Sequence, residues 1–377
     1  MYHMAAISYR HGLACYTLAL ATLGLFTVSG CNNAGTNQDG SSAQTMRLVL
    51  LTNGDDPFWD AMRQGMNKAN ADLNLADVNL RAELDKGDFS EEAQINKLKQ
   101  YATQSDIAAV AISSVAADNS RIADAMKALQ EKGVKVITVD SDMSNKDCRF
   151  AYLGTNNVIG GQELGKAAKG LRPEGGKYAT FVGLKTVANA KERIGGFGEG
   201  AGANFVSRDS LADQGDQNTA QENVKTALNN HPDIDTLVGI WAYNAHAIVK
   251  VVQDREIRDK TTIVVFDAAP LALKDMEEGN IDAMVVQNPY QMGYLGTQLM
   301  KALVEEDHET IASMFPGYDP ATQQFNGEGA DIYTTELRVV VPSEASPLKA
   351  EMFNEETKFF TYPEFREWMK ERSLTGS

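Results

Sequence analysis

The segment Val134-Lys135-Val136-Ile137-Thr138-Val139-Asp140 is a short, mostly apolar run that ends in a carboxylate. Its length and its β-branched residues are typical of a buried strand. Similar runs lie at 48–51, 107–112, 178–182, 236–240, 262–266 and 281–286, and a segment with helical periodicity follows each of them. Strands that alternate with helices form parallel sheets with helices on both faces. The sequence therefore predicts an α/β fold of the doubly wound, parallel-sheet class.

The composition fits a folded, acidic protein with two domains. The chain has 377 residues, 43% of them hydrophobic, and this length divides into two domains of ordinary size. The formal net charge is −16, and no block of lysine or arginine stands out. Because a nucleic-acid-binding protein needs a basic patch to neutralise phosphates, the composition excludes nucleic acid as a partner.

The first 30 residues have the pattern of a secretory signal peptide. An uncharged apolar run over residues 13–28 is too short to span a membrane and ends in Val28-Ser29-Gly30-Cys31. This ending resembles a bacterial lipoprotein signal, in which Cys31 is lipidated and anchors the protein to a membrane on its periplasmic or extracytoplasmic side. The alternative is an ordinary signal with a nearby cysteine. Residues 31–46, rich in Asn, Gly, Ser and Gln, are predicted to form a flexible tether.

Polar and aromatic side chains follow the predicted strands, where an open α/β sheet binds its ligands. They are carboxylates, amides, an arginine and tryptophans. Carboxylates accept hydrogen bonds from hydroxyls, amides donate and accept, arginine donates in a planar fork, and aromatic rings cover C–H faces. This combination predicts a site for a neutral, hydroxyl-rich molecule. The candidate residues are Asp56, Phe58, Trp59, Asp140, Arg193, Trp241, Asn244, Asp267 and Gln287.

Several short motifs occur in a characteristic order between residues 47 and 341. They are Asp56-Pro57-Phe58-Trp59, Thr138-Val139-Asp140, Gly154-Thr155-Asn156-Asn157 with Gly160-Gly161, Lys191-Glu192-Arg193 with Gly195-Gly196-Phe197, His231-Pro232-Asp233, Val265-Phe266-Asp267 and Val286-Gln287-Asn288-Pro289. Each is weak alone, but together, in this order and spacing, they resemble the type I periplasmic sugar-binding proteins, close in pattern to the ribose-binding family.

The resemblance implies two α/β lobes joined by three crossovers, with a sugar held between them. The expected N-terminal lobe comprises residues 47–154 and 288–311, and the expected C-terminal lobe comprises residues 155–287 and 332–341. Residues 312–331 are expected to form an inserted loop. Residues 342–377 extend past the usual end of the family, and their aromatic side chains are expected to pack back onto a lobe, with partner docking as the alternative.

The resemblance also implies roles for the candidate residues. Phe58 and Trp59 are expected to stack on the sugar ring, and Asp56 to bond a hydroxyl. The polar sugar-binding positions of the family correspond to Asp140, Arg193, Asp267 and Gln287. For several of these residues a purely structural role stays open, since aspartates and asparagines often cap helices and aromatic residues often lie in the core.

The chain departs from the ribose-type pattern at three positions. Ser141 stands where that pattern has arginine directly after the aspartate, and Trp241 stands where it has asparagine. An aromatic residue of the pattern is missing around Gly215. The resemblance therefore does not carry ribose specificity, and a pentose, a hexose or another polyol all remain open.

The predicted function is capture of a sugar or related polyol outside the cytoplasm and its delivery to an ABC permease, by a monomer without a cofactor. The alternative is a receptor that presents its closed form to a sensor kinase or chemoreceptor. No catalytic residue is predicted, because the common nucleophile, phosphate-binding and metalloprotease motifs are missing from the sequence. No metal site is predicted either, since His231, His246 and His308 do not share a metal-ligand spacing.

Overall fold

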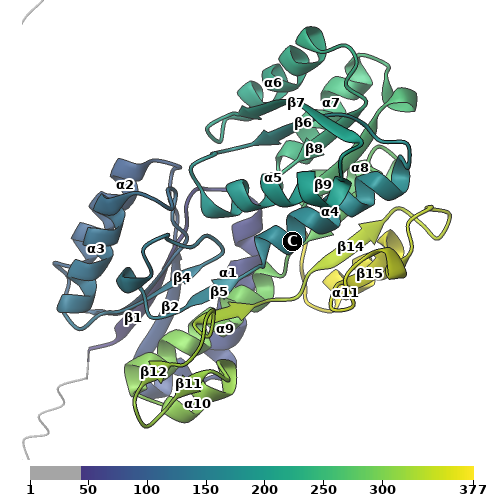
Figure 1. The fold of residues 1–377 in the computed structure, drawn as a ribbon. Coiled ribbons are helices and arrows are strands. Elements are labelled where there is room, and N and C mark those ends of the chain that lie inside the picture. The colour runs from purple at the N-terminus through teal and green to yellow at the C-terminus, as the bar shows by residue number, and fades with distance from the viewer. Residues whose placement is uncertain (1–43) are drawn as a thin grey trace, which may run out of the picture. The chain divides into compact units, whose positions relative to one another are not determined.

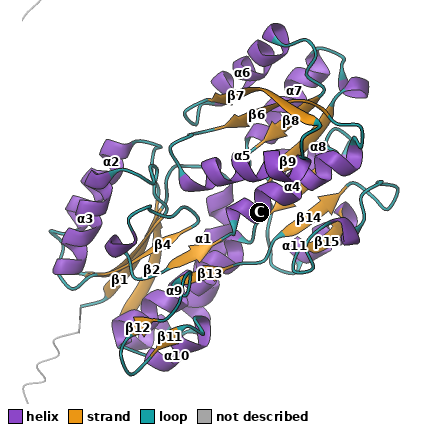
Figure 2. Ribbon diagram, in the orientation of Figure 1, coloured by secondary structure: helices purple, strands orange, loops and turns teal. Residues whose placement is uncertain are grey.

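The computed structural model describes residues 44–377, which form two lobes, each built on one sheet with helices on both faces (Figures 1 and 2). The predicted signal peptide, Cys31 and the tether up to residue 43 lie outside the described residues. The predicted fold class, α/β with two doubly wound lobes joined by three crossovers, is confirmed. Within the described part of the chain, no helix is both long and apolar enough to cross a membrane.

The first lobe is built on a sheet with the strand order β13-β5-β4-β3-β1-β2, in which all neighbours are parallel. Helices α1 and α9 cover one face of this sheet, and α2 and α3 cover the other (Figure 1). The N-terminal elements of the lobe are β1 (Met46–Leu51), α1 (Phe58–Asp72), β2 (Leu80–Asp85), α2 (Glu91–Tyr101), β3 (Ile107–Ile112), α3 (Ser120–Glu131), β4 (Lys135–Val139) and β5 (Tyr152–Gly154).

The second lobe is built on a sheet with the strand order β15-β14-β10-β9-β8-β6-β7. All neighbours are parallel except β10 and β14, which pair antiparallel. Its first elements are α4 (Asn157–Leu171), β6 (Gly176–Val182), α5 (Ala188–Ala201), β7 (Phe205–Ala212), α6 (Gln217–Asn230), β8 (Thr236–Gly239), α7 (Asn244–Asp254), β9 (Thr262–Phe266), α8 (Pro270–Glu277) and β10 (Ala283–Val286).

After β10 the chain returns to the first lobe and then crosses to the second lobe again. The elements of this return are α9 (Pro289–Glu305), α10 (His308–Met314), the hairpin of β11 (Tyr318–Asp319) and β12 (Gln324–Phe325), β13 (Ile332–Thr334) and β14 (Arg338–Val341). Short 3-10 turns lie at Leu75–Val78, Lys146–Cys148, Arg258–Lys260 and Ala350–Met352. The three crossovers therefore lie between β5 and α4, between β10 and α9, and between β13 and β14.

The structure corrects the expected boundaries in the returning part of the chain. Residues 332–341 were assigned to the C-terminal lobe, but β13 (Ile332–Thr334) pairs with β5 in the first sheet, so only β14 belongs to the second lobe. The stretch 312–331 is not a plain loop, because it holds the end of α10 and the β11–β12 hairpin. Its aromatic residues Phe315, Tyr318 and Phe325 pack in the core of the first lobe, which explains why an apparently irregular segment is ordered.

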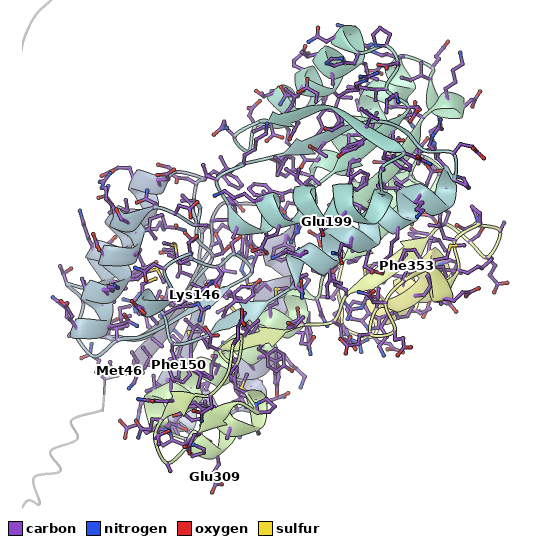
Figure 3. All side chains as sticks on the ribbon, in the orientation of Figure 1. Met46, Lys146, Phe150, Glu199, Glu309 and Phe353 are labelled. Atoms are coloured by element: carbon purple, nitrogen blue, oxygen red, sulfur yellow. The ribbon has the colours of Figure 1, made fainter. Side chains whose placement is uncertain are left out.

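Residues 342–377, called the C-terminal segment below, pack against the second lobe. Strand β15 (Lys358–Thr361) extends the second sheet beside β14, and helix α11 (Tyr362–Lys370) follows it directly. Phe365 of α11 is fully buried. Phe353, which Figure 3 labels in this segment, joins the hydrophobic core, and its ring stacks on that of Phe359. Strand β14 is therefore an inner strand of the second sheet.

Local sequence explains where several helices begin. The side chains of Asn119, Asn156 and Asp216 accept hydrogen bonds from backbone N–H groups in the first turns of α3, α4 and α6. Such caps satisfy donors that have no partner within the helix. The parallel strands that precede these helices end at the same edge of each sheet, whereas β14 and β15 run in the opposite direction.

Candidate functional site

Side chains from both lobes line one pocket at the carboxyl ends of the strands. The pocket holds about 310 Å³ of space that protein atoms do not fill. From the first lobe it is lined by Asn53, Asp56, Phe58, Trp59, Phe89 and Asp140, and from the second lobe by Asn189, Arg193, Trp241, Ala242, Asp267 and Gln287.

The two lobes touch each other beside the pocket. The hydroxyl of Thr186 donates to the carbonyl oxygen of Val115 (3.0 Å), and the Ala117 N–H donates to the carbonyl oxygen of Thr186 (3.2 Å). Lys191 Nζ lies 2.6 Å from Asp118 Oδ2 in a second contact of this kind. The lobes are therefore closed over the pocket.

Asn244 is the one predicted site residue that does not line the pocket. Its Oδ1 accepts from the backbone N–H of Trp241 (3.1 Å), and its Nδ2 donates to Asp213 Oδ2 (2.9 Å). Both ends of this buried amide are occupied where α7 begins, so it fixes the turn that carries Trp241. The placement favours a structural role over the predicted contact with ligand.

Asp140 and Asp267 occupy equivalent places in the two lobes. Each follows the last residue of a buried strand, and their φ angles of 60° and 62° both lie in the left-handed region. A residue other than glycine in this region is strained, and such strain concentrates at functional sites. The shared conformation turns each carboxylate toward the space between the lobes.

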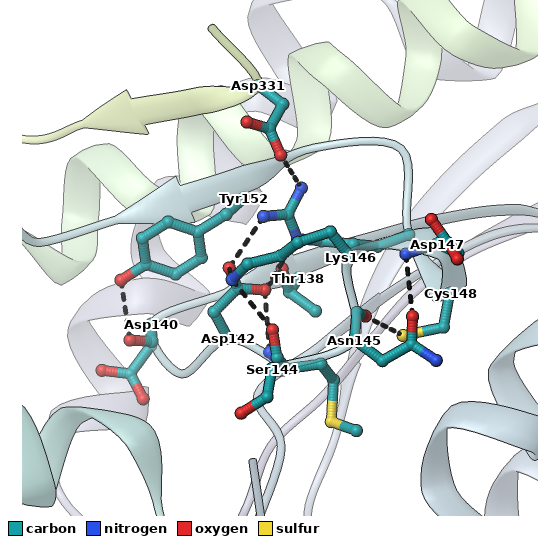
Figure 4. Close-up of polar contacts among 12 residues, drawn as sticks. Thr138, Asp140, Asp142, Ser144, Asn145, Lys146, Asp147, Cys148, Tyr152 and Asp331 are labelled. Carbon is teal, nitrogen blue, oxygen red and sulfur yellow. Dashed lines mark hydrogen bonds and ion pairs between the residues drawn. The ribbon is translucent and has the colours of Figure 1, made fainter. Parts of the chain in front are cut away.

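Asp140 is held by donors from both lobes. Ser113 Oγ donates to its Oδ2 (2.8 Å), and Nδ2 of Asn189, in the second lobe, lies 3.2 Å from the same oxygen. Its backbone carbonyl accepts from the hydroxyl of Tyr152 at 2.9 Å (Figure 4). These contacts hold the strained turn after β4 in one conformation.

The loop that follows Asp140 is tied down by a buried arginine. Arg149 Nε donates to Asp142 Oδ1 (2.7 Å), and its Nη1 donates to Asp331 Oδ2 (2.6 Å), next to β13. Figure 4 shows Asp142 and Asp331 on either side of this network. Ser141, which replaces the arginine of the ribose-type pattern, is buried, and its Oγ has no hydrogen-bond partner among residues 44–377.

Asp267 and Gln287 form a second fixed pair. Gln287 Nε2 donates to both carboxylate oxygens of Asp267 (3.2 and 3.0 Å), and the Gln287 backbone N–H donates to Oδ1 (3.2 Å). The remaining oxygen of the amide accepts from Thr155 Oγ1 (2.8 Å), which lies in the crossover between β5 and α4. The pair thus connects the end of β9 to the crossover between β10 and α9 and to the crossover between β5 and α4.

Arg193 is the cation of the pocket and is 1% exposed. Its Nε donates to Asn157 Oδ1 (3.0 Å), its Nη1 donates to the carbonyl oxygen of Ile240 (3.2 Å), and its guanidinium lies 4.2 Å from the ring centre of Phe266. Asp267 Oδ2 is 3.8 Å from Nη1. Nη2 has no hydrogen-bond partner in the described part of the chain, so it is the donor that remains for a ligand oxygen.

Phe58 and Trp59 both line the pocket at the start of α1. Their rings meet edge to face with centres 5.0 Å apart, and both residues are buried. Asp56 Oδ1 accepts from the backbone N–H of Phe58 (2.8 Å), which fixes the first turn of the helix. Adjacent helical residues usually point to different sides; here the helix end allows both rings to reach the same pocket.

Three polar or aromatic pocket residues are not among the candidates predicted from the sequence: Asn53, Phe89 and Asn189. Phe89 lies in the loop between β2 and α2 with a φ of 63°, and its ring stacks on Trp241 of the other lobe at 5.9 Å. A Cβ on Gly215 would lie 2.5 Å from this ring. The ring of Phe89 therefore fills the space next to Gly215, where a larger side chain would not fit.

Burial shifts the pKa values of the three pocket carboxylates upward. Burial raises the pKa of Asp56 to about 7 and, against the positive charge of Arg193, the pKa of Asp267 to about 6. Burial also raises the pKa of Asp140, and the charge of Arg193 again opposes the shift. Asp56 and Asp267 therefore take up and release a proton closer to neutral pH than an ordinary aspartate does.

These shifts predict that the three pocket carboxylates contribute a loss of stability as pH rises from about 4 to about 7. An ordinary Asp has a pKa near 3.9, so in this range these carboxylates bind more protons in the folded protein than in the unfolded chain, and their contribution to the free energy of unfolding decreases with pH. Asp56→Asn should reduce this decrease by about 1 kcal/mol or more, since one pKa unit corresponds to about 1.4 kcal/mol. Urea unfolding at pH 4.5 and 7.5, without added sugar, measures the difference.

The matched control for this prediction is Asp60→Asn, because Asp60 is exposed on the same helix. Its unfolding free energy should vary with pH as that of the unmodified protein does. If the unfolding free energy of Asp56→Asn varied with pH as that of the control does, Asp56 would not have a raised pKa in the folded protein.

The geometry of the pocket suits the binding of a small polar molecule. Within residues 44–377, no group of three or more His, Cys, Asp or Glu side chains is placed to hold a metal ion. Instead, fixed carboxylates, amides and one guanidinium face a small space between aromatic rings. That arrangement suits a compact molecule with many hydroxyls and at least one apolar face.

Comparison with known proteins agrees with this geometry. A family model described as "Periplasmic binding protein domain" matches residues 48–308. The ribose import binding protein of Salmonella typhimurium is 22% identical over 293 residues, which cover 75% of this chain and 92% of that protein.

Solved structures share the fold at similar identity. An ABC transporter solute-binding protein from Burkholderia graminis, in complex with D-arabinose, is 22% identical with a TM-score of 0.67, covering 79% of this chain and 96% of that one. A chain of the XylFII-LytSN complex is 23% identical with a TM-score of 0.64, covering 70% of this chain and 94% of that one.

Proposed function

The chain belongs to the periplasmic binding protein domain family, and from this premise we propose that it binds a sugar or related polyol between its lobes and delivers it to an ABC permease. The observation that carries the proposal is the closed pocket itself. Asp140 and Asp267 face it from opposite lobes, and Arg193 has a donor free for a ligand oxygen. The relative from Salmonella is named for ribose import and the structure from Burkholderia contains D-arabinose, which supports a sugar as the ligand.

The contacts suit reversible capture of a small sugar. A hydrogen bond to a charged group contributes about 1.5–3 kcal/mol, and aromatic geometry adds about 0.5–1.5 kcal/mol beyond burial. Asp140, Asp267 and Arg193 supply charged partners, and Phe58 and Trp241 supply rings. After the cost of immobilising the sugar, such a set gives a dissociation constant of roughly micromolar or tighter.

The remaining parts of the proposal concern location and assembly. Cleavage before Cys31 and lipidation of that residue would anchor the protein to the outer side of a membrane, and the tether would let the lobes reach a permease. The protein acts as a monomer in this scheme, without a cofactor and without catalysis. The permease recognises the closed conformation that the lobes adopt around the sugar.

Thermal unfolding of a soluble form that starts at Asn32 tests sugar binding. After removal of co-purified ligand, the protein is mixed with D-ribose, D-xylose, L-arabinose, D-allose, D-glucose, D-galactose or myo-inositol. A sugar at 1,000 times its dissociation constant stabilises a protein by about 4 kcal/mol, so one or a few of these should raise the melting temperature by several degrees.

Asp267→Asn serves as the matched variant, since it keeps the shape of the side chain but removes its charge. We expect it to fold and to lose most of the sugar-induced shift. A protein that responds to amino acids or nucleosides but to none of these sugars would overturn the substrate class.

A sensing role is the second candidate, because a chain in the XylFII-LytSN complex shares this fold. A closed, sugar-bound form can be presented to a receptor as well as to a permease. Uptake of the radiolabelled sugar by cells that lack this protein separates the two. Loss of uptake supports transport, whereas unchanged uptake with a lost transcriptional response to the sugar supports sensing.

A further inference from the structure

The backbone carbonyl group of Gln287 accepts hydrogen bonds from two distant parts of the chain. Its carbonyl oxygen accepts from Arg338 Nη1 (3.1 Å) and from Ser377 Oγ (3.1 Å), and all three residues are buried. The side chain of Gln287 points the other way, where it orients the carboxylate of Asp267. A displacement of this peptide would therefore move the amide that holds Asp267.

Asp267 is held in the same manner through its neighbour Ala268. The Ala268 N–H donates to the carbonyl oxygen of Ser377 (2.7 Å), and the Ser377 N–H donates to the carbonyl oxygen of Ala268 (3.0 Å). A Cβ on Gly376 would lie 2.9 Å from that carbonyl oxygen and from Pro270, so only glycine lets the two backbones approach this closely. The end of the C-terminal segment thus pairs with the strained turn that carries Asp267.

Helix α11 supports the arginine in this arrangement. The guanidinium of Arg338 lies 4.0 Å from the ring centre of Trp368, and that of Arg372 lies 4.4 Å from the same ring. Arg338 is 1% exposed, and burial lowers its pKa to about 10, so it stays charged at neutral pH. A buried cation over an aromatic face is stabilised by the ring, which keeps its Nη1 directed at Gln287.

We propose that the C-terminal segment is a brace that positions Asp267 and Gln287 for ligand binding, through Trp368 and Arg338 on one side and Gly376 and Ser377 on the other. Arg338 follows the crossover between β13 and β14, and Gln287 begins the crossover between β10 and α9. The brace therefore joins two of the three connections between the lobes to the pocket. Its positioning residues are Trp368, Arg338, Gly376 and Ser377.

Two substitutions remove the two sides of the brace. Trp368→Ala takes away the ring under Arg338, and Gly376→Val forces the backbone away from Ala268. Trp368→Phe keeps an aromatic face and should restore the behaviour of the unmodified protein. Thr375→Ala, at an exposed neighbour, controls for changes in this stretch, and Val249→Ala, in the buried core of the second lobe, controls for a loss of stability alone.

Hydrogen exchange without added sugar is the first measurement, and it does not depend on the proposed function. Exchange of the Ala268 amide should be at least tenfold faster in Gly376→Val and in Trp368→Ala than in the unmodified protein. Val249→Ala and Thr375→Ala should leave the ratio of Ala268 exchange to that of the inner strand β8 unchanged. Equal exchange at Ala268 in all variants would overturn the brace.

Affinity is the second measurement and rests on the proposed function. With the sugar from the panel above that shifts the unmodified protein most, both variants should bind at least tenfold more weakly, whereas Trp368→Phe and the two controls should bind within about twofold. Variants that bind as the unmodified protein does would overturn the positioning role. If the unmodified protein binds none of the sugars, the proposed function fails. The hydrogen-exchange data then decide alone whether the C-terminal segment holds the turn at Ala268.

Discussion

Replacing Arg193 with methionine should lower the free energy of unfolding by about 3–5 kcal/mol and abolish sugar binding. The pocket holds three carboxylates, and Arg193 is the cation among its lining residues. Removing one member of a buried charge pair leaves the partner uncompensated, and this is the cause of the large cost. Asp267, whose oxygen lies 3.8 Å from Nη1, and Asp140 would both lose the charge that opposes their raised pKa values.

The loss of binding has a separate cause from the loss of stability. Nη2 of Arg193 is a buried donor in the pocket without a partner among the described residues, so a ligand oxygen would lose its charge-assisted hydrogen bond. Arg193→Lys separates the two effects, because it keeps the charge but not the planar fork. We expect this variant to fold with a loss of about 1–2 kcal/mol and to bind sugar at least tenfold more weakly.

The control is Arg208→Met on the surface of the second lobe. Arg208 pairs with Asp233, and the side chains of these residues are 34% and 48% exposed. An exposed ion pair contributes about 0–1 kcal/mol, so this variant should unfold and bind nearly as the unmodified protein does. Urea unfolding and isothermal titration calorimetry measure both quantities. Equal costs for Arg193→Met and Arg208→Met would mean that Arg193 does not compensate the buried carboxylates.

The fold class and the resemblance to the type I periplasmic sugar-binding proteins were predicted correctly from the sequence, since both depend on local patterns. Buried parallel strands leave continuous apolar runs, and a run such as 262–266 identifies both a strand and the position of the residue after it. For that reason Asp140 and Asp267 could be found without coordinates. Their matching left-handed conformations, by contrast, have no mark in the sequence.

Contacts between distant segments could not be predicted in this way. Phe89 lies after a weakly apolar strand, and only the closed arrangement of the lobes brings its ring to Trp241. Asn244 follows a strand as a ligand residue would, yet Asp213, 31 residues earlier, occupies its amide. Strand β13 is three residues long and half exposed, so no pattern distinguished it from the loop before it.

The second large effect on stability and sugar binding is expected at Trp241, whose ring stacks on Phe89 across the lobes. Trp241→Ala removes a 6%-exposed indole, the hydrogen bond from Nε1 to Asn189 Oδ1 (3.0 Å) and the stacking partner of Phe89. Truncation of a buried tryptophan costs about 3–5 kcal/mol, and the lost ring face should weaken sugar binding by a factor on the order of 100. Urea unfolding and calorimetric titration again provide the two values.

Phe89→Ala should weaken sugar binding less, by roughly tenfold, and its effect should depend on Trp241. The rings stack only when the lobes meet. The binding free energy lost in the double variant should therefore differ from the sum of the losses in the two single variants by about 0.5–1.5 kcal/mol.

Phe89→Gly tests the backbone strain separately. Glycine adopts the φ of 63° without cost, so this variant should be more stable than Phe89→Ala. Phe197→Ala, in the buried core of the second lobe, should lower stability without changing affinity. Strict additivity of Phe89→Ala and Trp241→Ala would mean that the pair does not form when sugar is bound.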